Sequence, residues 1–191
     1  LKGRIQAGAI GEVVSVDANF CLRLLDLEGR HRRRDLGGGR LLEIGIYPLS
    51  LGRFLLGEPV EIKALGRLTT DGVDAVLGGV MTHESGGITT FRSGLEALSD
   101  LTASIVGTSG RATVEVPFWA PEAFTLERSD GSELERVHLP HRGLAHEAEH
   151  AMARIRAGEN ESDVQTWAAT VANMELMDEV RRQLGVTYDV D

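Results

Sequence analysis

The sequence is short of three features that would assign it to a particular class of protein. Cys21 is the single cysteine among 191 residues, so no intramolecular disulfide can form and a reducing, cytoplasmic setting is favoured. No apolar run approaches the roughly 18 residues that a membrane-spanning helix needs. Basic residues are in deficit, because 20 Lys and Arg stand against 29 Asp and Glu, for a net charge of -9. Nucleic acids attract basic surfaces, so we expect neither a nucleic-acid partner nor a membrane partner.

The chain also lacks an initiator methionine. Its opening, LKGRIQAGAIG, is typical of the end of a helix, because glycine commonly follows a helix C-terminus. The valines of EVVSVDANF then alternate as in a strand with one buried face. With 42% hydrophobic and 26% charged residues, the composition is that of a globular protein, and the length suits one domain. We therefore expect residues 1–191 to form a single domain that is a piece of a longer protein.

Most of the chain predicts strands, with a helix over residues 40–56 and two more that end at Gly158 and Gly185. Short turn signals separate the strand-like runs, which are VEIKALGRL, VDAVLGGVMTH, GITTFRSGL, SDLTASIVGTSGRATVEV, EAFTLERS and LERVHLP. Consecutive strands with short turns favour an antiparallel or mixed sheet. The predicted fold is therefore α+β: a large, mostly antiparallel open sheet with helices packed on one face.

The helix at 40–56 carries an unusual pair of polar groups. Its apolar residues lie nearly all round the helical wheel, which predicts a buried helix, and Pro48 should loosen the turn at residue 44. Glu43 and Tyr47 fall on one face, one turn apart. A buried carboxylate costs several kcal/mol unless it is paired. Two interpretations stay open: either Glu43 caps the first turn or pairs with an arginine of residues 30–35 while Tyr47 packs in the core, or the two form a site for chemistry.

The segment GGGRLLEIGIYPLSLGRFLLG resembles the signature helix of the glucose-fructose oxidoreductase, inositol dehydrogenase and rhizopine catabolism (Gfo/Idh/MocA) family of NAD(P)-dependent oxidoreductases, in its dihydrodiol dehydrogenase-like branch. The likeness continues through GAIGEVVSV, GGVMTHESGGITTF, IVGTSGRATVEVPFWAPEAFTLER and LAHEAEHAMARIRAGENES, in that order. It covers the family's C-terminal α+β domain and implies that the N-terminal Rossmann domain is missing. A dinucleotide fingerprint is not found, because Leu42 stands where the third glycine after Gly37 and Gly39 belongs. The family's Glu-Lys-Pro motif is absent as well.

The resemblance implies a role for each of several residues. Tyr47 matches the proton donor or acceptor, and Glu43 matches an acidic position that is commonly Asp. Gly38 and Gly39 would lie near the nicotinamide of NAD or NADP, which the missing domain would mostly bind. A phenol with a pKa of about 10 needs a nearby cation to act near neutrality, and by resemblance that cation is the missing lysine.

Further positions follow from the same resemblance. Trp119 lies in a segment similar to the substrate-facing loop, and His146 opens the next helix near the same expected pocket. An edge packing residue and a solvated helix terminus are the alternatives for these two. Residues 30–35 are interpreted as a loop that reaches the cofactor phosphate or Glu43.

The stretch HEAEH at 146–150 fits the zinc-protease pattern of two histidines around a glutamate. The helical wheel argues against this interpretation. It predicts a core stripe of Leu144, Ala148, Ala151 and Ile155, with the histidines nearly opposite, whereas zinc ligands need a dry cleft. We therefore predict no metal site.

Two hypotheses remain. In the first, the chain is the substrate-binding and dimerising domain of an NAD(P)-dependent oxidoreductase that acts on a small molecule, a sugar, polyol or cyclic diol. The open sheet then predicts a homodimer, and the isolated chain, without its Rossmann partner, should be inactive. In the second, the chain is a binding module that dimerises through the same sheet and performs no chemistry.

Overall fold

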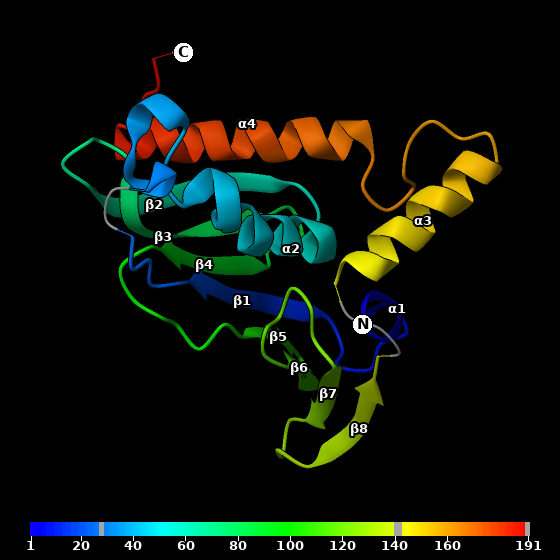
Figure 1. Cartoon of the computed structure of the whole chain (residues 1–191). Coiled ribbons are helices and arrows are strands. Elements are labelled where there is room, and N and C mark those ends of the chain that lie inside the picture. The colour runs from blue at the N-terminus through cyan, green and yellow to red at the C-terminus, as the bar shows by residue number, and fades with distance from the viewer. Residues whose placement is uncertain (27–28, 140–142, 190–191) are drawn as a thin grey trace.

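The computed structural model describes residues 1–26, 29–139 and 143–189, and an eight-stranded sheet forms its centre (Figure 1). The strand order is β2-β3-β4-β1-β5-β6-β7-β8. The strands are β1 Val13–Cys21, β2 Pro59–Leu68, β3 Asp74–His83, β4 Ile88–Gly94, β5 Ala103–Gly107, β6 Gly110–Val114, β7 Ala123–Arg128 and β8 Glu133–His138. Every neighbouring pair is antiparallel except β1 with β4, which is parallel. The prediction of a large, mostly antiparallel open sheet is confirmed.

Two of the helices, α2 Ile46–Leu56 and α4 Trp167–Leu184, cover the sheet. The others are α1 Lys2–Gln6 and α3 Leu144–Arg156, with the short turns η1 Arg30–Arg32, η2 Arg34–Leu36 and the π-helical turn η3 Leu41–Gly45. α2 packs on β1 and β4, and α4 packs on β2 (Figure 1). These two helices cover one face of the sheet, as predicted.

The core lies between this helical layer and the sheet. One group of buried side chains comes mainly from β1 and β5 to β7, and a second lies under α4. Val16, Phe20 and Ile105 belong to the first group, and Leu77 and Met177 to the second. The alternation that the sequence shows in β1 thus places its buried residues under α2.

The opposite face of the sheet presents a row of unburied side chains. The strand registers align Lys63, Val80, Thr90, Asp17, Ser104 and Thr113 across six neighbouring strands. All six are half-buried or exposed, whereas their alternate neighbours are mostly buried. This face is mixed in character, with short hydroxyl side chains at its centre.

The helix predicted over residues 40–56 starts with a looser turn. The carbonyl of Arg40 accepts from both Ile44 N (2.9 Å) and Gly45 N (2.8 Å), and the α-helix proper begins at Ile46. Pro48 has no N–H to bond the carbonyl of Ile44, so regular helical bonding is interrupted there, as predicted. The expectation of a buried helix is wrong on one side, because Tyr47 is 42% exposed.

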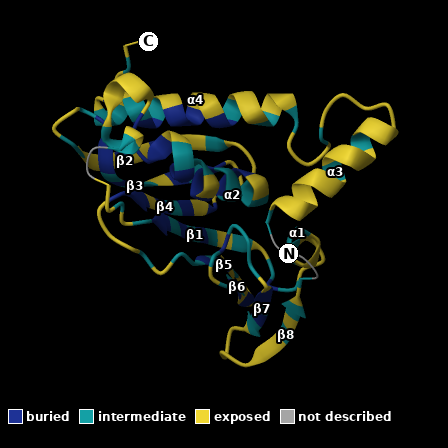
Figure 2. Cartoon of the chain, viewed as in Figure 1, coloured by how far each residue is buried: buried dark blue, intermediate teal, exposed yellow. Residues whose placement is uncertain are grey.

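The core stripe predicted for the HEAEH helix is also wrong. α3 has no buried residue, and the exposed fractions of Leu144 and Ile155 are 75% and 73% (Figure 2). α3 extends away from the sheet in Figure 1, so within the described residues its apolar side chains have no layer to pack against. The amphipathic pattern of this helix is therefore not matched by burial among the described residues.

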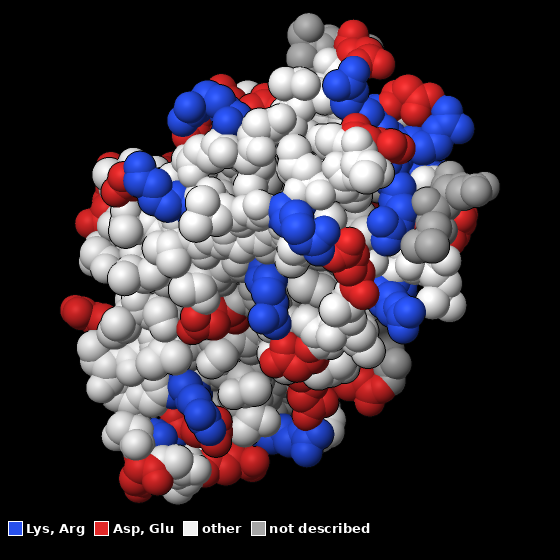
Figure 3. Space-filling view, turned by 90° about the vertical axis from the view of Figure 1, so that its left-hand side faces the viewer, with Lys and Arg blue, Asp and Glu red and all other residues white. Residues whose placement is uncertain are grey.

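Charges of both signs share the surface. On the side shown in Figure 3, Lys and Arg side chains are intermixed with Asp and Glu. Many of them pair, as Arg67 does with Glu96 and Arg111 with Glu127. Among the described residues, no helix has the length and apolar character needed to cross a membrane.

Candidate active site at the start of helix α2

Backbone conformation and close packing together account for the three consecutive glycines. Gly37 and Gly39 have positive φ angles of 66° and 104°, which favour glycine. A Cβ on Gly38 would lie 2.6 Å from the carbonyl oxygen of Arg33 and 2.7 Å from that of Arg30. A Cβ on Gly39 would overlap the carboxylate of Asp74. The glycines therefore fold residues 30–40 tightly against the sheet, and the roles of Gly38 and Gly39 toward a cofactor stay predictions.

Asp74 holds the start of the helix from the first residue of β3. Its Oδ2 accepts from the backbone N–H groups of Arg40 (2.6 Å) and Leu41 (2.8 Å), which a helix start leaves without internal partners. Asp74 is 1% exposed, and this burial raises the pKa of its carboxyl. Its Oδ1 has no hydrogen-bond partner among the described residues. The sequence analysis missed this residue.

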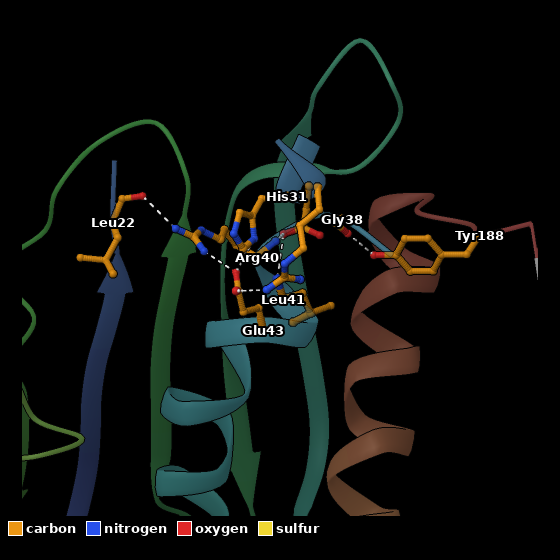
Figure 4. Close-up of polar contacts among 9 residues, drawn as sticks. Leu22, His31, Gly38, Arg40, Leu41, Glu43 and Tyr188 are labelled. Atoms are coloured by element: carbon orange, nitrogen blue, oxygen red, sulfur yellow. Dashed lines mark hydrogen bonds and ion pairs between the residues drawn. The ribbon is translucent and has the colours of Figure 1, made fainter. Parts of the chain in front are cut away.

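Glu43 is the centre of a cluster of basic side chains (Figure 4). Its Oε1 lies 2.8 Å from Arg30 Nη2, its Oε2 lies 2.9 Å from His31 Nδ1, and Arg40 Nη1 also donates to Oε2. The predicted pairing of Glu43 with an arginine of residues 30–35 is therefore confirmed, whereas the core position that the same interpretation gave to Tyr47 is wrong.

The cluster is supported by contacts with two other segments. The Arg40 guanidinium also reaches the carbonyl oxygen of Leu22, at 3.3 Å. Tyr188, beyond α4, donates its hydroxyl to the carbonyl of Gly38 at 2.6 Å (Figure 4). The strand end after β1 and the C-terminal segment thus hold the loop from both sides.

Tyr47 stands beside an aromatic wall. Its ring meets Phe20 edge-on, with the centroids 5.4 Å apart, and Trp119 at 6.4 Å. Phe20 and Trp119 are stacked, with centroids 3.6 Å apart and an angle of 11° between the rings. The structure thus brings Tyr47 and Trp119 together, and their roles toward a substrate stay predictions. Phe20 was missed, because alternation in β1 marks it only as a core residue.

His146 lies at a different place. It lines a cleft of about 790 Å³ between α3 and residues 159–165, together with His150, Arg154 and Ile155, and the lining includes neither Tyr47 nor Trp119. The structure does not join His146 to the aromatic wall, and its role toward a substrate stays a prediction. Within the described parts of the chain, no three His, Cys, Asp or Glu side chains group as metal ligands would.

Comparison with known proteins gives a consistent group of relatives. Residues 1–113 match the family model described as the GFO/IDH/MocA C-terminal domain. The chain is 28% identical over its whole length to the trans-1,2-dihydrobenzene-1,2-diol dehydrogenase of Bos taurus, of which it covers 59%. It is 32% identical over 95% of its length to the dTDP-3,4-didehydro-2,6-dideoxy-alpha-D-glucose 3-reductase of Streptomyces violaceoruber, of which it covers 57%.

Solved structures share the fold. An aldose-aldose oxidoreductase from Caulobacter crescentus superposes with a TM-score of 0.82 and 21% identity, over 95% of this chain and 56% of that one. A 3-ketoreductase from Actinomadura kijaniata, in complex with NADP and TDP-benzene, gives a TM-score of 0.77 and 23% identity, over 96% and 57%. The chain thus spans somewhat more than half the length of the proteins it matches.

Proposed function

Because the chain belongs to the GFO/IDH/MocA family, as its match to the C-terminal domain over residues 1–113 establishes, we propose that it is the substrate-binding and oligomerisation domain of an oxidoreductase. The parent enzyme transfers a hydride between NAD or NADP and a sugar, a polyol or a cyclic diol. Tyr47 donates or accepts the proton, and Glu43 belongs to the same site. The observation that carries this proposal is the half-exposed phenol of Tyr47 beside the stacked rings of Phe20 and Trp119.

The chemistry needs a proton to move at the substrate oxygen while the hydride moves at carbon. NAD(P), when bound, supplies or takes the hydride. The 42% exposure of Tyr47 leaves its side chain accessible to a substrate. The flat faces of Phe20 and Trp119 suit the apolar face of a ring. Relatives named as a dehydrogenase of a cyclic diol and as a reductase of a dTDP-linked sugar support this substrate class.

The cofactor fits this chain only in part. The N–H groups of Gly38 and Gly39 donate to the carbonyls of Arg33 and His31, both at 2.8 Å, so neither is available to cradle a phosphate. We therefore assign most of the cofactor contacts to an N-terminal Rossmann domain of the parent protein. NADP bound to the Actinomadura 3-ketoreductase supports a nicotinamide cofactor, without deciding between NAD and NADP.

Activation of Tyr47 also depends on the other domain. A phenol acts near neutral pH when a cation stands close to it, but Arg30 and Arg40 are already paired with Glu43. The lysine that the family resemblance assigns to the Rossmann domain would supply the charge. The isolated chain should therefore neither bind NADPH tightly nor turn over.

Exposed apolar side chains on the helices support docking of such a domain. Leu144 and Ile155 on α3 and Trp167 at the start of α4 are 75%, 73% and 65% exposed. Where such side chains form a contiguous apolar patch they mark an interface, and we propose that the Rossmann domain covers them. The free thiol of Cys21, which is buried, suits a cytoplasmic location for the parent protein.

The test of catalysis uses the full-length protein with trans-1,2-dihydrobenzene-1,2-diol and NADP, and follows NADPH by its absorbance. Tyr47→Phe should lower kcat by roughly 10²–10⁴-fold while NADP affinity stays near normal. Tyr188→Phe, the matched control, removes the chain's other phenolic hydroxyl and should change kcat by no more than a few fold. Full activity of Tyr47→Phe would exclude the acid/base role.

We further propose that the open sheet face forms a homodimer. The row that runs from Lys63 to Thr113 offers a flat surface on which Val80 is 39% exposed. Light scattering should give the mass of a dimer for the chain and that of a monomer for Val80→Asp, with Val171→Asp on α4 as the control. A full-length protein that dimerises in this way but neither binds NADP nor oxidises sugars, polyols or diols would favour the non-catalytic module.

A further inference from the structure

Arg40 is a buried arginine at the start of the helix that bears Tyr47. It is 3% exposed, although it follows three glycines and precedes an apolar run. Arginine is almost never so deeply buried unless it is paired. Neither the proposed chemistry nor the predicted binding residues include it.

Both the backbone and the side chain of Arg40 are fixed. Its N–H donates to Asp74, and its carbonyl accepts two N–H groups of the π-helical turn. Its guanidinium bonds Glu43 through Nη1 and the carbonyl of Leu22 through Nη2. One residue thereby ties the end of β1, the start of β3 and the first turn of the helix together (Figure 4).

The ion pair also limits what Glu43 can do. Oε1 accepts from Arg30 and Oε2 accepts from Arg40, while His31 Nδ1 lies 2.9 Å from Oε2. Charge-assisted bonds to both oxygens hold the carboxylate in one orientation. Of the three basic side chains around Glu43, that of Arg40 is the most buried, at 4% exposure against 58% for Arg30 and 25% for His31.

We propose that Arg40 is a positioning residue, which with Glu43 fixes the first turn of the helix so that the Tyr47 ring is held edge-on to Phe20. In this arrangement Glu43 anchors residues 30–40 and does not relay the proton. The inference rests on the proposed role of Tyr47 in hydride-transfer chemistry. Arg40 would affect the reaction indirectly, through Glu43 and Tyr47.

The kinetic test compares Arg40→Met, Glu43→Gln and the double variant in the full-length protein, with the diol and NADP. Loss of positioning should lower kcat by roughly 10–100-fold in each single variant, with the KM for NADP within about threefold of wild type. The double variant should lose no more than Arg40→Met alone, because the two residues act as a unit. Arg40→Lys keeps the charge and should recover about tenfold of the loss, although it cannot bond Glu43 and Leu22 as a fork.

Arg67→Met is the matched control, because Arg67 forms an ion pair with Glu96 while its side chain is 60% exposed. Its kcat should equal that of wild type. Two results would overturn the proposal. One is a double variant whose loss in kcat is the product of the losses in Arg40→Met and Glu43→Gln, and the other is an Arg40→Met enzyme with full kcat.

A second measurement on this chain separates the positioning role from the proposed function. The chain has two tyrosines, so in a Tyr188→Phe background labelled with ¹³C-tyrosine all tyrosine ring signals in the NMR spectrum come from Tyr47. We expect one set of ring signals for wild type, broadened or doubled signals for Arg40→Met, and one set again for Arg40→Lys. If the full-length protein does not oxidise the diol, the proposed function fails on that substrate. The tyrosine spectrum then still tests whether Arg40 positions Tyr47. Unchanged Tyr47 signals in a folded Arg40→Met chain would exclude the positioning role; if that variant does not fold, the same reading is taken from Glu43→Gln.

Discussion

Asp74 offers a direct test of how the start of helix α2 is held. Its buried carboxylate is the acceptor for the N–H groups of Arg40 and Leu41, at 2.6 and 2.8 Å. Asp74→Ala removes that acceptor and leaves two buried donors without a partner. Each unsatisfied buried donor costs about 1–3 kcal/mol, so the two together should lower the free energy of unfolding by roughly 2–6 kcal/mol.

Asp74→Asn separates the acceptor from the charge. The amide oxygen can still accept both N–H groups, because both bonds are made to one oxygen of the carboxylate. The substitution also removes the cost of burying a charge. We therefore expect the free energy of unfolding of Asp74→Asn to lie within about 1 kcal/mol of wild type at neutral pH, and to exceed that of Asp74→Ala by at least about 1 kcal/mol.

The pH dependence has a definite sign. Burial raises the pKa of Asp74 in the folded state, so the folded chain binds this proton more tightly than the unfolded chain does. The contribution of Asp74 to stability is therefore fully present below the unfolded pKa of about 3.9, and it is lost as the pH rises through the folded pKa. Asp74→Asn should remove this component, so the difference between Asn and wild type should grow in favour of Asn as the pH rises.

The assay is urea unfolding of this chain, followed by circular dichroism at several pH values. Asp71→Ala is the control, because Asp71 is exposed in the turn before β3 and should change stability by less than about 0.5 kcal/mol. An Asp74→Ala chain as stable as this control would refute the account of the helix start. A difference between Asn and wild type that shrinks as the pH rises would refute the pH argument.

Two further predictions concern the glycines and helix α3. Gly39→Ala combines a positive φ of 104° with overlap on Asp74, so it should destabilise the chain by at least about 2 kcal/mol in the same urea assay. Gly57→Ala is the control: Gly57 has a positive φ of 83° but open space around it, so the substitution should cost about 1 kcal/mol. Equal losses from the two variants would contradict the packing argument. Ile155→Asp should leave the stability of this chain within about 0.5 kcal/mol of wild type, because the Ile155 side chain is 73% exposed. Val180 in α4 is 0% exposed, so Val180→Asp should prevent folding. A large loss of stability from Ile155→Asp would mean that α3 packs against the domain.

The sequence predicted most of the fold because its signals are local. The alternating residues of β1 and the turn signals between the later strands report on neighbours a few positions away, and the sheet follows from them. The burial of α3 was predicted wrongly by the same logic. An amphipathic stripe such as Leu144 and Ile155 says that a helix expects a partner surface, but not that this surface lies in the same domain.

In the site, too, local contacts can be predicted from the sequence and distant ones cannot. Arg40 and Glu43 are three residues apart on one helical turn, so their ion pair can be expected from the spacing. Asp74 lies 34 positions from Arg40, in a strand whose register is fixed by its neighbours, and no local pattern points from one to the other. Phe20 stacks on Trp119 from 99 positions away in the sequence, because the fold of the core brings the two rings together.

These contacts also explain why the glycines stand where they do. Residues 30–40 carry several arginines into a small space beside β3, and that is possible because Gly38 and Gly39 have no side chains to displace the carbonyl of Arg33 or the carboxylate of Asp74. The tight fold brings Arg30 and His31 onto Glu43, and it leaves Tyr47 on the exposed side of α2. A turn held by Asp74 and followed by a half-exposed phenol fits the proton-transfer site that we propose, since the group that would react is accessible while the backbone that carries it is bonded to the sheet.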